Sequence, residues 1–254
     1  MLNQSNYDPK VSLPIVAGEY MQATGFLYKS KSQLYLVTAK HNILPTDVHI
    51  SNPRTGGNLW EVDTDFAADR IDMFLPDGTD WASHRLLLSD IPEEGIVTAP
   101  ATDSIALQLP PDIATHDLTV FSSEDLGESS EEDESLVTFG YGTDSLPAKT
   151  TDYSVSRFPD ELRPPQELTL SNMPVPKNTF AGLDGAFGIG LDENRSETQK
   201  YNGLSGAPVL GDGLVGIHSG TSEIPEAAIE QDPSLANTVK INYFGTRFLR
   251  KVRH

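Results

Sequence analysis

The chain of 254 residues contains no cysteine. Disulfide bridges are therefore excluded, which disfavours the oxidising compartments where such bridges stabilise secreted domains. A secretory leader is not expected either, because residues 1–8 are polar and have neither a basic stretch nor an apolar core. The two absences together predict a cytoplasmic protein.

Basic residues are scarce as well, with 18 Lys and Arg against 37 Asp and Glu, for a net charge of −19. Nucleic acids and anionic membranes both attract basic surfaces, so neither is expected as a partner. No apolar run approaches the length of a membrane span. The acidic surplus is typical of a highly soluble protein, and a functional acidic surface is the alternative.

Metal and cofactor motifs are absent too. The sequence has no HExxH pair, Cys/His cluster, P-loop or EF-hand loop. The Asp-rich stretch 63–72 lacks regular ligand spacing, so we predict neither a metal ion nor a cofactor. What the chain does have is 37% hydrophobic residues over a length that accommodates one large or two small domains.

The most informative motif is G-L-S-G-A-P-V at 203–209, followed by L-V-G-I-H-S-G at 214–220. Gly203 allows the backbone to turn so that amide groups converge where an oxyanion would form. Gly206 and Ala207 leave room for the backbone of a substrate. A glycine–serine string alone is more often an ordinary turn, so the upstream residues decide its meaning.

Two upstream segments supply partners for this serine. The segment L-Y-L-V-T-A-K-H ends at His41, and D-S-I-A-L begins at Asp103. The chain order is thus His41, Asp103, Ser205, which are the residue types of a general base, an orienting carboxylate and a nucleophile. A serine hydroxyl needs such an adjacent base, and histidine has a suitable pKa. Each residue alone has a structural alternative: a strand-end histidine, a surface aspartate or a turn serine.

With these motifs the chain resembles the trypsin/chymotrypsin-like serine peptidases, in particular their bacterial and virus-like branches. The resemblance covers most of the chain, since G-F-L-Y at 25–28, L-V-T-F-G-Y-G at 136–142 and the three segments above follow in the family's order. It implies an all-β fold of two antiparallel β-barrels of the chymotrypsin type, with the active site between them. It also implies His41, Asp103 and Ser205 as the catalytic triad.

The resemblance further implies the amides of Gly203 and Ser205 as the oxyanion hole. Digestive trypsins carry an aspartate before the nucleophile that pairs with a newly cut N-terminus, whereas this chain has Leu204. Residues 14–18, P-I-V-A-G, are weakly similar to an activation site but lack the preceding basic residue. Activation by cleavage of the N-terminus is therefore not expected.

The strand V-G-I-H-S-G is similar to the one that lines the S1 pocket of glutamyl endopeptidases and viral 3C-like proteases. There a histidine contacts the Glu or Gln side chain at P1, which implies a specificity role for His218, with Ser219 and Gly220 beside it. Lys200 stands on the implied pocket wall, and Gln199 stands where Arg/Lys-specific trypsins have an acidic residue. We expect a preference for Glu or Gln at P1. For His218 the alternative is a buried strand histidine with a backbone partner.

The domain organisation follows from the strand density and from one acidic run. Short strand-like segments separated by Pro, Gly, Asp and Asn recur along the chain. We predict an N-terminal barrel over 1–121, an acidic solvated linker over 122–135, and a C-terminal barrel over 136–254 that ends in a short basic helix packed on it. Residues 66–82 and 221–237 are rich in Asp, Pro and Ala and are predicted to be insertion loops.

The expected function is a serine endopeptidase that acts on polypeptides through an acyl-enzyme, with restricted rather than digestive specificity. A dedicated partner or regulatory protein is consistent with that restriction. The alternative is a catalytically inactive module of the same fold that binds protein, because chain order does not prove that the three side chains converge.

Overall fold

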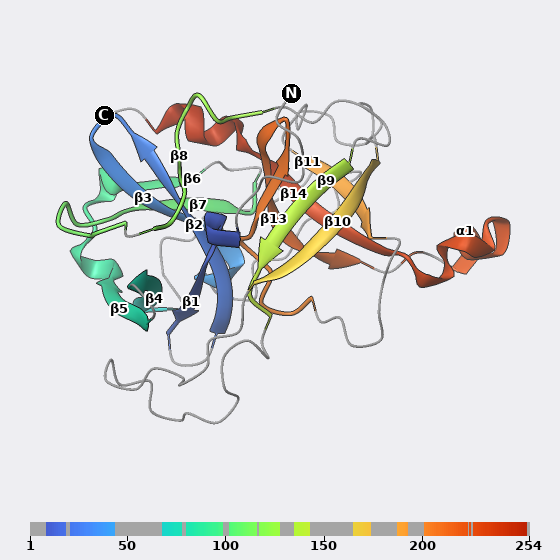
Figure 1. The fold of residues 1–254 in the computed structure, drawn as a ribbon, viewed down its shortest axis with the longest axis horizontal. Helices are drawn as coiled ribbons and strands as arrows, with labels where there is room; N and C mark the ends of the chain where they lie inside the picture. The colour runs from blue at the N-terminus through green and yellow to red at the C-terminus, as the bar shows by residue number, and fades with distance from the viewer. Residues whose placement is uncertain are drawn as a thin grey trace.

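A computed structural model gives the fold of the chain as two β-structures that lie side by side (Figure 1). The residues that it describes are 9–18, 21–43, 68–77, 80–98, 102–115, 117–127, 135–142, 165–173, 187–192, 201–222, 224 and 226–252. Within these ranges no helix is both long and apolar enough to cross a membrane.

The first β-structure is an eight-stranded sheet. Its strands are hydrogen-bonded in the order β5-β4-β1-β2-β3-β7-β6, and β8 pairs in parallel with β2. Over the described residues its two ends do not pair, so the first of the two expected barrels is a half-barrel. The strands are β1 (Leu13–Ala17), β2 (Met21–Ser30), β3 (Gln33–Ala39), β4 (Arg70–Asp77), β5 (Asp80–Leu87), β6 (Ile96–Thr98), β7 (Ser104–Gln108) and β8 (Val120–Phe121). The 3₁₀ helices of this half are Pro9–Val11, Lys40–Asn42, Leu88–Asp90 and Glu93–Gly95.

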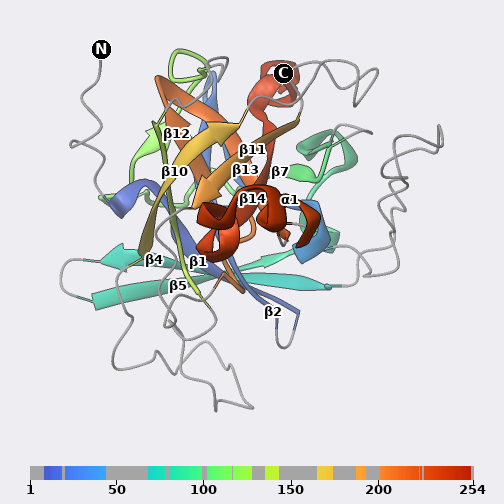
Figure 2. The ribbon, with the colours of Figure 1, turned by 90° about the vertical axis from the view of Figure 1, so that its right-hand side faces the viewer.

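The second β-structure is a closed antiparallel barrel in the order β10-β11-β14-β13-β12-β9. Its strands are β9 (Ser135–Gly140), β10 (Gln166–Met173), β11 (Phe187–Asp192), β12 (Pro208–Gly211), β13 (Gly213–Ser222) and β14 (Val239–Gly245). Helix α1 (Glu226–Gln231) projects from the side of the barrel that is away from the first sheet (Figure 2). The 3₁₀ helices Pro233–Asn237 and Thr246–Lys251 precede and follow β14. The predicted all-β class is confirmed.

Strands β2 and β3 are buried on both faces, because they lie between the two cores. Successive side chains of a strand point to opposite faces. Leu27 and Leu36 therefore enter the core of the first sheet, whereas Phe26, Tyr28 and Val37 pack against the barrel. The barrel contributes the other half of this interface cluster: Val137, Phe139, Leu210, Leu214 and Ile217. The two β-structures therefore dock through a hydrophobic contact, to which β2 and β3 contribute the side chains that face the barrel.

The segment 66–82 is not an insertion loop, as its Asp and Pro content suggested. It contains β4 and the start of β5, which form a hairpin. Its alternate apolar residues enter the core of the first sheet: Ile71, Met73 and Leu75. The carboxylate of Asp72 is buried and accepts two hydrogen bonds from the Arg85 guanidinium, at 2.7 and 3.0 Å. This bidentate pair neutralises the buried carboxylate of Asp72, a residue type that is otherwise expected at the surface.

The segment 221–237 is also more ordered than an insertion loop. Strand β13 extends to Ser222, and helix α1 and the 3₁₀ helix Pro233–Asn237 follow. Asp232 caps that 3₁₀ helix, because its carboxylate accepts from the Ser234 amide at 3.0 Å. The sequence prediction missed these short elements because no apolar face marks them: α1 buries none of its residues.

The C-terminal segment packs between the two β-structures, rather than on the barrel alone as predicted. Phe248 and Leu249 join the interface cluster that contains residues of both halves. On the first sheet, the Tyr28 hydroxyl donates to the Leu249 carbonyl at 3.5 Å, and the Ser30 hydroxyl donates to the Val252 carbonyl at 2.5 Å. The terminal 3₁₀ helix therefore fastens the barrel to the sheet.

The described part of the predicted linker, residues 122–127, is attached to the barrel. The Leu214 amide donates to the Asp125 carbonyl at 2.7 Å, and the Gly127 amide donates to the Leu214 carbonyl at 3.0 Å. Residues 128–134 lie outside the described residues. The first part of the acidic run is thus paired with β13 instead of fully solvated.

Candidate active site

Strand pairing in the first sheet brings His41 and Asp103 together. His41 lies in the 3₁₀ helix that follows β3, and Asp103 directly precedes β7. Because β3 and β7 are antiparallel with Ala39 opposite Ser104, the residues just beyond these ends are neighbours. The Lys40 amide donates to the Asp103 carbonyl at 3.2 Å, which extends the pairing by one step.

The Asp103 carboxylate orients the His41 ring. Asp103 is fully buried; its Oδ2 lies 2.6 Å from His41 Nδ1, and its Oδ1 accepts from the His41 amide at 3.0 Å. Because an ionised carboxylate only accepts, Nδ1 carries the proton and Nε2 of the neutral ring is an acceptor. Burial lowers the pKa of His41, but the charge and the hydrogen bond of Asp103 outweigh burial, so the pKa lies above its ordinary 6.5.

Ser205 lies on a tight turn that precedes β12. Gly203 and Gly206, on either side, have φ of +91° and +94°, a region of backbone that favours glycine. The Leu204 side chain is buried in the barrel core and so attaches the turn to the barrel. The Ser205 hydroxyl donates to the Ser219 carbonyl at 3.3 Å and makes no hydrogen bond to the His41 ring in the structure as described.

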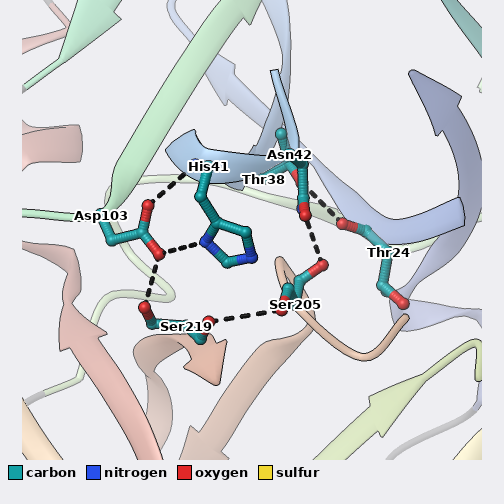
Figure 3. Close-up of polar contacts among 7 residues, drawn as sticks. All are labelled: Thr24, Thr38, His41, Asn42, Asp103, Ser205 and Ser219. Carbon is teal, nitrogen blue, oxygen red and sulfur yellow. Dashed lines mark hydrogen bonds and ion pairs between the residues drawn. The ribbon is translucent and has the colours of Figure 1, made fainter. Parts of the chain in front are cut away.

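Ser219, on β13, contacts both halves of the site (Figure 3). Its hydroxyl donates to Asp103 Oδ2 at 2.5 Å, and its carbonyl accepts from Ser205. The three predicted residues His41, Asp103 and Ser205 are therefore gathered in one hydrogen-bonded cluster. Sequence reasoning assigned Ser219 to the S1 pocket and missed its bond to Asp103, because that bond depends on how the barrel docks against the sheet.

The amides of Gly203 and Ser205 are the expected oxyanion donors. In the part of the chain that the structure describes, neither amide has a hydrogen-bond acceptor. The alternating amides of Leu204 and Gly206, by contrast, donate to main-chain carbonyls at 3.1 and 2.7 Å. Unpaired amides on a glycine turn are the groups that can receive a developing negative charge.

The residues expected at the S1 pocket are only partly described. Gln199 and Lys200 lie outside the described residues. Ser219 and Gly220 are partly exposed on β13, where the pairing with β14 is irregular between His218 and Gly220. His218 itself has 0% of its surface exposed, so it does not line an open pocket wall as expected.

The buried His218 ring fits the alternative of a buried strand histidine, with the Gly220 main chain as a weak hydrogen-bond partner. Among the described residues, neither ring nitrogen has a hydrogen bond of normal geometry. Burial and the neighbouring His41 lower the pKa of His218 to about 4, against weaker opposite effects of the Gly220 main chain and the Asp103 charge. The ring is therefore neutral at pH 7, and the protein uses its hydrogen-bonding capacity only in part.

Sequence reasoning also missed several buried polar residues at the site. Lys40, next to His41, is fully buried; burial lowers its pKa to about 8, against the charge of Asp103. Thr24 and Asn42 contact the Ser205 turn, and the only available signals were their places beside the G-F-L-Y and T-A-K-H motifs. No group of three metal-binding side chains gathers in the described ranges.

No model of a known protein family and no curated protein matches the sequence. Solved structures do match its fold. GrC aligns with a TM-score of 0.53 at 12% identity, over 96% of this chain and 93% of that one. The thermostable serine protease AL20 from an extremophilic microorganism aligns with 0.51 at 11% identity, over 96% and 95%. The scabies mite inactivated protease paralogue S-I1 aligns with 0.50 at 14% identity, over 95% and 91%.

The chain has the chymotrypsin-type fold. At this level of identity the likeness to the three structures shows the fold alone, and it confirms the resemblance to that extent. One of the three is named as a serine protease and another as an inactivated protease, so the chymotrypsin-type fold itself does not decide whether Ser205 reacts.

Proposed function

We propose that the protein is a serine endopeptidase that cleaves polypeptides through an acyl-enzyme on Ser205. The observation that carries the proposal is the buried Asp103 carboxylate on His41 Nδ1, beside a serine on a glycine turn. This arrangement supplies a base with a raised pKa, the group that orients it and a candidate nucleophile. The unpaired amides of the same turn support the proposal further.

In the proposed reaction, rotation about χ1 turns the Ser205 hydroxyl from Ser219 toward His41. Ser205 Oγ attacks the scissile carbonyl carbon while His41 Nε2 takes its proton, and Asp103 stabilises the imidazolium. The oxyanion accepts from the amides of Gly203 and Ser205, each worth about 3 kcal/mol. The peptide C–N bond then breaks, and the leaving amine takes the proton from His41. Water deprotonated by His41 releases the acyl group as the carboxylic acid product.

We further propose that P1 is Glu or Gln and that His218 is its polar contact. The incompletely bonded ring of His218 supports this, because a buried polar group without a well-formed hydrogen bond is costly unless a ligand satisfies it. The neutral ring suits an amide, and Lys200 is the residue that would favour a carboxylate. Since His218 is fully enclosed, this contact requires the ring to become accessible when substrate binds.

A catalytically inactive binding module of the same fold is the second candidate. Two observations favour it: the Ser205 hydroxyl donates to Ser219 rather than to His41, and a matched structure is named as an inactivated protease. A binding module would keep the site geometry but cleave no peptide.

Hydrolysis of a library of fluorogenic peptides that differ only at P1 tests both proposals. We expect cleavage by the wild type with Glu or Gln preferred, and no cleavage by Ser205→Ala. His218→Ala should reduce cleavage after Glu or Gln far more than cleavage after Ala or Leu. A profile dominated by Arg, Lys or aromatic residues overturns the P1 assignment alone, and a wild type as inert as Ser205→Ala overturns the endopeptidase.

A further inference from the structure

The carbonyl groups of the Ser205 turn are bound by the first sheet. Thr24 Oγ1 donates to the Gly203 carbonyl at 2.8 Å. The Ser205 carbonyl accepts twice, from the Thr24 amide at 3.1 Å and from Asn42 Nδ2 at 3.0 Å. Figure 3 shows Asn42 reaching the Ser205 carbonyl from the element that carries His41. The nucleophile turn of the barrel is therefore held by two residues of the other β-structure.

The same peptide groups are also held at their opposite ends by the barrel. The Leu204 amide, which shares a peptide plane with the Gly203 carbonyl, donates to the Tyr201 carbonyl at 3.1 Å. The Gly206 amide, which shares a plane with the Ser205 carbonyl, donates to the His218 carbonyl at 2.7 Å. Peptide planes on both sides of the Leu204–Ser205 peptide are thus fixed.

The intervening peptide is fixed as well. The Leu204 carbonyl accepts from the Ala207 amide at 2.9 Å. In a planar trans peptide the N–H points opposite to the carbonyl, so this bond sets the direction of the free Ser205 amide. The orientation of the proposed oxyanion donor is therefore determined before any substrate binds.

The donors of the first sheet are themselves immobilised. Thr38 Oγ1 donates to the Thr24 carbonyl at 2.7 Å, and Asn42 Nδ2 donates to Thr38 Oγ1 at 3.0 Å. Thr24 Oγ1 accepts from the Tyr141 amide at 2.8 Å, so its own proton is directed to Gly203. Thr24, Thr38 and Asn42 are at most 4% exposed. These three residues form a threonine–asparagine network.

Gly206 permits the close approach that the network needs. A Cβ at this position would lie 2.0 Å from the Thr24 carbonyl oxygen and 2.3 Å from Thr38 Oγ1. Its φ of +94° also disfavours any side chain. The turn is therefore shaped to dock on β2 and β3 at this point.

We propose that Thr24 and Asn42 are positioning residues that hold the Ser205 turn against the first sheet and so align the nucleophile and its amide with His41. The catalytic purpose of the network rests on the function proposed above. Neither residue touches the reacting atoms; they act through the Gly203 and Ser205 carbonyls. Displacements near 1 Å of a reacting group cost on the order of 100-fold in rate, so loss of these bonds should slow acylation.

The test measures the saturation kinetics of labelling by a fluorophosphonate probe for wild type, Thr24→Val, Thr24→Ser and Asn42→Leu. We expect the maximal labelling rate of Thr24→Val and Asn42→Leu to fall roughly 10- to 100-fold per folded molecule. Probe affinity and the pH midpoint of labelling should stay unchanged, because His41 keeps its Asp103 contact. Thr24→Ser retains the hydroxyl and should restore most of the rate.

Thr138→Val is the matched control. Thr138 is a buried threonine of the barrel whose hydroxyl has no partner among the described residues, so its loss should leave the labelling rate unchanged. Melting temperatures of all variants separate unfolding from misalignment, and Asn42→Leu decides the question if Thr24→Val does not fold. Wild-type rates in both Thr24→Val and Asn42→Leu overturn the inference alone. A wild type that is never labelled overturns the proposed function and the catalytic purpose of the network with it.

Discussion

Ser219 donates its hydroxyl to Asp103 Oδ2 across 2.5 Å, on the oxygen that also contacts His41 Nδ1. Ser219 belongs to β13 of the barrel, whereas Asp103 precedes β7 of the first sheet. Together with the His41 amide, the buried carboxylate has three donors. The orientation of the base therefore depends on the docking of the two halves.

Removal of this donor should leave a slower enzyme with a more basic histidine. Ser219→Ala takes one hydrogen bond from the Asp103 carboxylate, which then holds the His41 proton more strongly and raises its pKa further. We expect the rate of peptide cleavage to fall roughly tenfold, as for a hydrogen bond to a charged group. The pH–rate profile measures both effects. Ser12→Ala, at a buried serine without a partner among the described residues, is the control and should behave as wild type.

The pH dependence of the reaction should reflect the raised pKa of His41. Only the neutral ring accepts the serine proton, so the rate should rise with pH through a midpoint above 6.5. Asp103→Asn removes the charge that raises this pKa, and should lower the midpoint and reduce the rate by several orders of magnitude. Stability should change with pH in the opposite direction to the rate. The His41–Asp103 pair stabilises the fold below about pH 6.5, and this contribution to the free energy of unfolding is lost as pH rises through the pKa of His41 in the fold. A midpoint below 6.5 in the wild type contradicts this.

His218 should make the protein sensitive to acid. With a pKa of about 4 in the fold and an ordinary value of 6.5 when unfolded, only the unfolded chain binds a proton between these pH values. Stability should therefore fall by about 3 kcal/mol between pH 7 and pH 4 from this group alone. In His218→Leu the fall should be smaller by that amount. Chemical denaturation at a series of pH values gives the comparison, and parallel curves for the two proteins contradict it.

Gly206 and Gly220 should respond differently to the same substitution. Gly206→Ala forces a Cβ against Thr24 and Thr38 with positive φ, so we expect a loss of about 2 kcal/mol or more in the free energy of unfolding. A Cβ at Gly220 meets nothing within 4 Å, so Gly220→Ala should keep its stability. Equal stability of the two variants in urea denaturation is the opposing outcome.

The candidate triad residues could be predicted because each is next to a recognisable strand. His41 follows one apolar strand and Asp103 precedes another, so local patterns located both. Thr24 and Asn42 could not be predicted, since their bonds to the Ser205 turn join positions 179 and 163 residues apart. The hairpin within 66–82 was missed because its Asp residues suggested a loop. Asp72 is in fact buried in a strand, where Arg85 neutralises its charge.

We propose above all that Ser205 is a nucleophile activated by His41. Reaction of the wild type with a fluorophosphonate, followed by intact mass and peptide mapping, tests it most directly. We expect one adduct per chain on Ser205, which forms faster as pH rises through the His41 midpoint and is absent from Ser205→Ala. An unlabelled wild type, or equal labelling of wild type and Ser205→Ala, contradicts it.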